Sequence, residues 1–141
     1  MFRRSLALAS IAVLFAGTAS AASEKFHADL TPGAEVPPTK STGSGEANVT
    51  LDTATHEITY DVTYKGLTSA VTAGHIHGPA EPGKNAGVVI PFANATTSPI
   101  HGTKKLTSEQ EQQLTSGLYY VNIHSKNNPS GAIRGQLTTV K

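Results

Sequence analysis

The chain has 141 residues, with no cysteine, no tryptophan, six histidines and a formal net charge of +1 when the histidines are neutral. The lack of cysteine excludes disulfides, thiolate metal sites and thiol redox chemistry. Because the chain has no basic cluster to neutralise a phosphate backbone, we expect no nucleic-acid partner.

The first 22 residues have the pattern of a cleavable export signal. Arg3 and Arg4 precede an apolar run of 11 residues over 6–16, and small residues follow. A membrane-spanning helix needs roughly 20 apolar residues, so a short membrane anchor is the less favoured interpretation and we expect no membrane span. We predict a mature domain over residues 23–141, in the periplasm or outside the cell. Its net charge is −1, because nine Lys and Arg remain against ten Asp and Glu.

The pattern of the mature chain predicts an all-β domain. Apolar and polar residues alternate in short runs, and Gly, Pro, Asn and Ser separate these runs, which is typical of antiparallel sheets. We predict a Greek-key sandwich or a flattened barrel, with long connections over residues 78–86 and 93–107. The strands expected are about seven, over residues 24–30, 46–51, 56–65, 71–77, 87–92, 118–125 and 132–140.

One short helix is expected near residues 108–115. Thr107 or Ser108 is a suitable N-cap with Gln or Glu three residues later, and Gly117 is a suitable stop.

The candidate site residues are histidines. On a strand, residues i and i+2 point to the same side, so His75 and His77 can face one ligand while Ile76 packs on the other side. His124 lies on the polar side at the end of another alternating strand, and His101 is the one plausible fourth nitrogen. Imidazole ligands without thiolate favour copper or zinc over calcium or magnesium, with copper first in the affinity order.

A structural role for the same histidines remains open. Six histidines in 141 residues give roughly 0.2 expected pairs at spacing two, so the His-x-His pair alone is weak evidence. In this alternative, His75, His77 and His124 donate ring hydrogens to loop carbonyls and clamp the Gly-Pro and Asn-Pro turns. We expect His27 and His56 to be ordinary exposed residues, and this is also the alternative for His101.

Four sequence blocks resemble the CHRD (chordin) domain family. They cover residues 26–38, 72–80, 119–125 and 128–137, and they follow the family order. In animals the domain is a repeated module of chordin, an extracellular antagonist of growth factors, and in bacteria similar domains stand alone as exported proteins. The cysteine-rich repeats of chordin are absent. The resemblance implies an extracytoplasmic binding module. From the histidines we expect it to bind copper or zinc near its surface, the alternative being an extracytoplasmic protein partner without metal, and we expect a monomer.

A looser likeness concerns the copper/zinc superoxide dismutases. The order His75, His77, His101, His124 and Arg134 follows that of their copper ligands and active-site arginine. Their zinc ligands and disulfide cysteines are absent, so this likeness implies at most a copper-only analogue. The alternative for Arg134 is a salt bridge or a fork that caps a turn. Because no other catalytic motif is present, a binding module is favoured over an enzyme.

Overall fold

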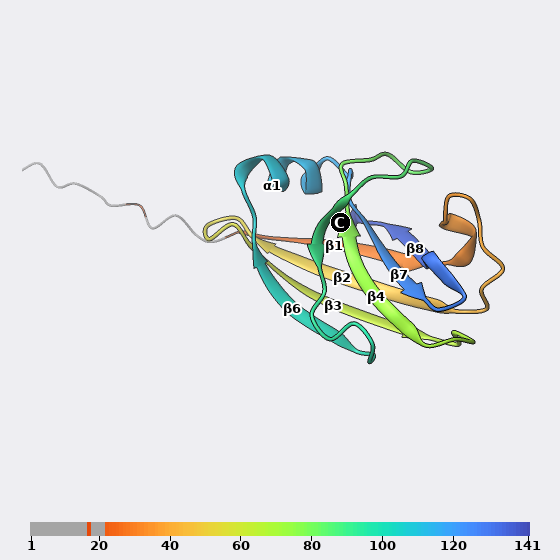
Figure 1. The fold of residues 1–141 in the computed structure, drawn as a ribbon. Coiled ribbons are helices and arrows are strands. Elements are labelled where there is room, and N and C mark those ends of the chain that lie inside the picture. Colours follow the sequence, from red (N-terminus) through yellow and green to blue (C-terminus); the bar gives the residue numbers. More distant parts are fainter. Residues whose placement is uncertain (1–16, 18–21) are drawn as a thin grey trace, which may run out of the picture.

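The computed structural model describes residues 17 and 22–141 of the chain (Figure 1). They form a sandwich of two antiparallel sheets. The export signal predicted over residues 1–22 lies outside the described residues, apart from Gly17 and Ala22. Within the part of the chain that is described, no helix is long and apolar enough to cross a membrane.

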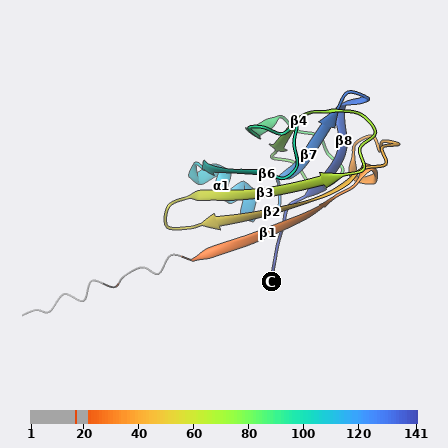
Figure 2. The same cartoon turned by 90° about the horizontal axis from the view of Figure 1, so that it is seen from below.

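One layer of the sandwich is a five-stranded sheet. Its strand order is β6-β3-β2-β1-β9, and the neighbouring strands β1, β2, β3 and β6 run side by side in Figure 2. The bounds are β1 Ser23–Leu30, β2 Ser44–Asp52, β3 Glu57–Lys65, β6 Ile100–Lys105 and β9 Thr138–Thr139.

The second layer is a four-stranded sheet with the order β5-β4-β7-β8. Its strands are β4 Val71–His77, β5 Val88–Pro91, β7 Tyr120–Ser125 and β8 Asn128–Gln136. A short 3-10 helix, η1 (Pro32–Ala34), follows β1, and the helix α1 (Ser108–Thr115) follows β6.

The predicted all-β class and the single α-helix are confirmed. Thr107 caps α1: its side chain accepts a hydrogen bond from the Gln110 backbone, and the Gln110 side chain accepts one from the Thr107 backbone. This reciprocal capping box satisfies two backbone donors that the first helical turn leaves unpaired. The described strands form a sandwich rather than a closed barrel, so the flattened-barrel alternative is wrong.

The strand count differs from the prediction at two places. The connection expected over residues 93–107 contains β6, an edge strand in which Ile100 is the only buried residue, so it lacks an apolar alternation. The strand expected over 132–140 is divided at Leu137, where the chain passes from β8 in one sheet to β9 in the other. In addition, β8 begins at Asn128, inside the turn predicted from the sequence. The strand can include Pro129 because β8 lies at the edge of its sheet, where a missing backbone donor is tolerated.

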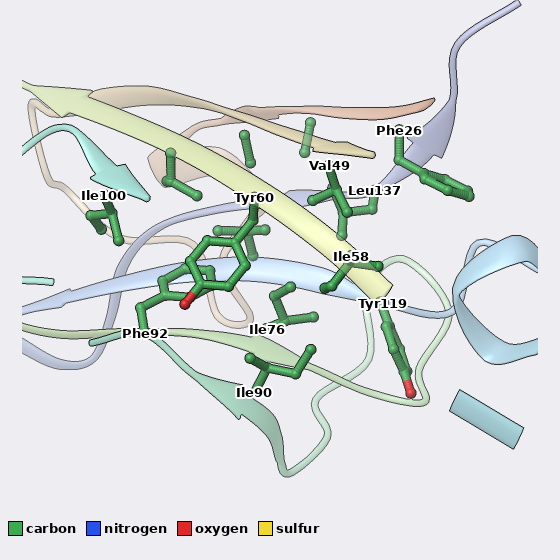
Figure 3. Close-up of a cluster of buried hydrophobic side chains, with 14 of the residues drawn as sticks. Phe26, Val49, Ile58, Tyr60, Ile76, Ile90, Phe92, Ile100, Tyr119 and Leu137 are labelled. Carbon is green, nitrogen blue, oxygen red and sulfur yellow. The ribbon is translucent and has the colours of Figure 1, made fainter. Parts of the chain in front are cut away.

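The core fills the space between the sheets (Figure 3). Phe26, Val49 and Ile58 of the five-stranded sheet and Ile76 of β4 are each 1% exposed, and Ile123 of β7 is fully buried. Burial of such side chains is the main stabilising term, and truncating one of them to alanine typically costs about 2–5 kcal/mol. Because side chains alternate along a strand, burial of Ile76 and Ile123 turns their neighbours in the sequence to the outer face of the four-stranded sheet.

Candidate metal centre

Three histidines meet on the outer face of the four-stranded sheet. His75 and His77 lie on β4 and His124 lies on β7, and the antiparallel register pairs Ala73 with His124 and His75 with Asn122. The ring centroid of His75 is 5.2 Å from that of His77 and 4.8 Å from that of His124. We refer to His75, His77 and His124 as the histidine triad.

The triad presents its ring nitrogens to one another. One nitrogen from each histidine lies within 4.8 Å of the other two, and His75 Nδ1 is 3.0 Å from His124 Nε2. Copper and zinc bind imidazole nitrogen at about 2.0–2.1 Å, so two nitrogens at this separation subtend an angle of about 95° at a shared ion. That angle lies between the square-planar and tetrahedral values, which are the geometries of copper(II) and zinc sites.

Backbone carbonyls fix the tautomer of two histidines of the triad. His77 Nδ1 lies 3.0 Å from the Ala86 carbonyl oxygen, and His124 Nδ1 lies 2.9 Å from the Pro129 carbonyl oxygen. Since a carbonyl can only accept, each Nδ1 carries the hydrogen and each Nε2 keeps its lone pair. His77 Nε2 is buried and has no hydrogen-bond partner in the described part of the chain.

The sequence left open whether the histidines are metal ligands or structural clamps, and these contacts are compatible with both roles at once. The predicted clamps to loop carbonyls are present for His77 and His124. A metal-ligating histidine usually donates its second ring N–H to a carbonyl or a carboxylate, which orients the ring and fixes its tautomer. A clamped histidine is therefore also a prepared ligand.

His75 and His77 are neutral at physiological pH in the metal-free protein. Burial lowers the pKa of His75 to about 4, and the neighbouring His124 and His77 add to this effect. Burial also lowers the pKa of His77. His77 is only 8% exposed, so the sequence-based expectation of surface histidines is wrong for this residue. Neutral imidazoles are the form that binds a metal ion.

The structure does not bring His101 to the triad. It lies on β6 in the opposite sheet, is exposed and pairs with Asp61 of β3. The physical reason is that residues 93–107 supply an edge strand and not a loop reaching the other sheet. Among residues 17 and 22–141, the histidine triad is the only group of three potential ligands that is close enough to hold one ion.

Arg134 has a structural role, which the sequence analysis gave as the alternative to an active-site arginine. Its guanidinium donates to Asn85 Oδ1 at 2.8 Å and to the Lys84 carbonyl, which anchors the loop over residues 78–86. Its Cζ also lies 3.4 Å from the centroid of the Tyr120 ring. These contacts commit the guanidinium to the loop and the ring.

Tyr120 was missed in the sequence as a site residue. Its ring stacks on that of His77, with centroids 4.9 Å apart and planes 2° apart. Its hydroxyl lies 3.2 Å from the Ala86 carbonyl oxygen, which also accepts from His77, and 3.1 Å from the Ala86 nitrogen. Only its position on the same side of the strand as His124 could have indicated this role.

A cavity of about 190 Å³ adjoins the triad at His77, and we refer to it as the polar chamber. Glu35 enters it from the segment after η1 and is 6% exposed. Asn122 of β7 donates to Glu35 Oε1. Sequence reasoning gave neither residue a role, because Glu35 lies 40 residues before His75 in an expected loop. The lining residues of the chamber are Glu35, Val36, His77, Asn85, Ala86, Tyr120, Asn122, Ser130 and Arg134.

The fold and this site define a small all-β sandwich domain with a histidine triad on the outer face of one sheet. The chain belongs to the CHRD domain family, since the family model for the CHRD domain matches residues 26–137. The matched range contains the whole triad and the polar chamber. No curated protein matches the chain. Family membership supports a binding module.

Proposed function

We propose that this protein is an exported CHRD-domain binding module that holds one copper or zinc ion through His75, His77 and His124. The observation that carries the proposal is the meeting of three imidazole side chains, each with a ring nitrogen within 4.8 Å of the other two. His77 Nε2 is in addition buried and has no hydrogen-bond partner among the residues that the structure describes. A buried polar atom without a partner costs roughly 1–3 kcal/mol. A bound ion would remove that cost.

The donor set supports copper or zinc over other ions. The triad offers three imidazole nitrogens and no oxygen, whereas calcium and magnesium require oxygen ligands. The affinity order of divalent ions places copper above zinc. Three protein ligands also leave at least one coordination position for a small ligand, as in zinc sites that are not purely structural.

Export is part of the proposal. Its support is the pattern of Arg3, Arg4 and the apolar run over residues 6–16, together with the absence of cysteine. The proposed location is the periplasm of a double-membrane bacterium, or the outside of any other cell.

Calorimetric titration with copper(II) and zinc(II) tests the metal site. The protein lacking residues 1–22 retains all the strands and both helices that the structure describes. We expect binding of one ion per chain, and we expect the variant His75→Ala/His77→Ala to lose it. The matched control is His27→Ala/His101→Ala, which also removes two histidines but leaves the triad intact. Equal binding by both double variants would exclude the triad as the site.

The second candidate is a protein-interaction module that needs no metal, which family membership supports. For such a module, the triple variant His75→Ala/His77→Ala/His124→Ala would keep its partner binding. Pull-down of partners from an extracytoplasmic fraction, with the native protein and the triple variant side by side, separates the two candidates.

A further inference from the structure

The most unusual buried group outside the triad is the carboxyl of Glu35. It crosses from the segment after β1 to the outer face of the four-stranded sheet, where Asn122 donates to it. Asn122 is the register partner of His75. Gly131 leaves room for the carboxyl, since a Cβ there would lie 2.5 Å from Glu35 Oε1. Asn122 and Gly131 therefore give this carboxyl a defined position in the cavity that His77 also lines.

No cation neutralises Glu35 within the described residues. Arg134 is near enough to affect it, but the guanidinium donates to Asn85 and Lys84, and no ion pair joins it to Glu35. An unpaired charge in a buried position is unfavourable. Burial raises the pKa of Glu35 to about 7, although the Asn122 hydrogen bond and the charge of Arg134 both lower it.

In the described structure, the groups around the triad offer no negative charge to a bound cation other than that of Glu35. The titratable and charged groups that share the polar chamber with Glu35 are His77 of β4, Tyr120 of β7 and Arg134 of β8. None of these three is a carboxyl group, and no histidine of the triad can supply a negative charge. A divalent ion would add two positive charges to this space, with Arg134 already nearby.

We propose that Glu35 is the counter-charge of the metal centre and is a carboxylate when copper or zinc is bound. Metal-free molecules that hold Glu35 as a carboxylic acid lose its proton on binding. The O–H bond of Glu35 breaks as the ion binds, its proton goes to solvent, and no electron is transferred. This inference rests on the proposed metal site. It gives Glu35 an electrostatic role without placing it among the ligands.

The variant Glu35→Gln separates charge from packing. Glutamine keeps an oxygen to accept from Asn122 and nearly the same volume, but it cannot ionise. The matched control is Glu46→Gln, which removes one exposed carboxylate from β2 in the opposite sheet. Titration with copper(II) at pH 7.5 gives the affinity, and titrations in two buffers of different ionisation enthalpy count the protons released.

We expect Glu35→Gln to bind copper(II) on the order of tenfold more weakly than the native protein, because an opposite charge near an ionised group commonly shifts its equilibrium by one unit or more. At pH 6.5 the variant should also release fewer protons per ion. In the metal-free state at pH 8 its urea midpoint should be higher than that of the native protein, because no buried carboxylate is left unpaired. Glu46→Gln should change none of these values.

Infrared difference spectra of the native protein test the proposal without a variant. At pH 6.5 the absorption of a protonated carboxyl should disappear when zinc is added. An unchanged band, or Glu35→Gln binding copper with native affinity and native proton release, would overturn the role of Glu35 and leave the metal site in place. Absence of any metal binding by the native protein would instead remove the metal site itself.

Discussion

The two outer faces of the sandwich carry histidines in opposite environments. On the five-stranded sheet, His27 lies 2.9 Å from Asn48 Oδ1 and His101 pairs with Asp61, both at the solvent-exposed surface. On the four-stranded sheet, His77 is buried and bonded to a backbone carbonyl.

The loops make the difference between these faces. On the outer side of β2 and β3 most side chains are exposed. Over the other sheet, Thr39 donates to the Ala132 carbonyl and Asn85 to the Val36 carbonyl, which fastens the segments after η1 and after β4 to the sheet and to each other. The carbonyls that His77 and His124 meet instead of water set the tautomer of these two rings. Burial, in contrast, lowers the pKa of His75 and His77.

The largest expected difference between the two faces is in how copper changes the stability of the protein. A free copper concentration of 100 times the dissociation constant should raise the free energy of unfolding by about 2.7 kcal/mol. Urea unfolding with and without copper measures this change. The increase should vanish in His75→Ala/His77→Ala and persist in His27→Ala/His101→Ala. A copper effect of equal size in both variants would contradict the assignment of the ion to the covered face.

The second prediction tests whether the loop that carries Ala86 supports the metal site, using the neighbouring residues Tyr119 and Tyr120. Tyr120→Phe keeps the stacked ring but removes the hydroxyl that holds Ala86, so we expect copper affinity to fall about tenfold, the low end of outer-shell effects. The control is Tyr119→Phe, because Tyr119 is buried and its hydroxyl donates to Gln113 rather than to Ala86. Calorimetry should show native affinity for this control. Equal losses in both variants would point to a general loss of packing.

In the absence of metal, the histidines of the two faces should differ in the pH at which they bind a proton. Hydrogen bonds that the His27 ring donates to Asn48 and Asp29 raise the pKa of His27, whereas burial lowers the pKa of His75 to about 4 and also lowers that of His77. The unfolded chain protonates His75 near pH 6.5, so its contribution to stability is lost as the pH falls from about 6.5 towards 4. The contribution of His27 is instead present below pH 6.5 and is lost as the pH rises through its raised pKa. NMR titration of the ring protons checks the order, and a common midpoint for His27 and His75 would contradict it.

The smallest effect is expected at the exposed ion pair. His101→Ala should change the free energy of unfolding by less than about 0.5 kcal/mol, since its partner Asp61 is also exposed and such pairs contribute little. Urea denaturation measures the change, and metal affinity should stay native. A loss above about 2 kcal/mol, beyond the usual range for such pairs, would show that this face is more than a solvated surface.

The spacing of the histidines in the sequence determined part of the site by itself. Alternation along β4 and β7 places His75, His77 and His124 opposite the buried Ile76 and Ile123, because each strand has only two faces. Local pattern also predicted the capped helix after Thr107 and most strand positions.

Only the tertiary structure decided which of these residues meet. The pairing of β4 with β7 brings His124 to His75, and the exclusion of His101 follows from its strand joining the other sheet. Glu35, Tyr120 and Ala86 join the site through contacts that span 34 or more residues of the chain. Alternation acts between neighbours and can be read from a sequence, whereas strand order and loop placement result from how the whole core packs.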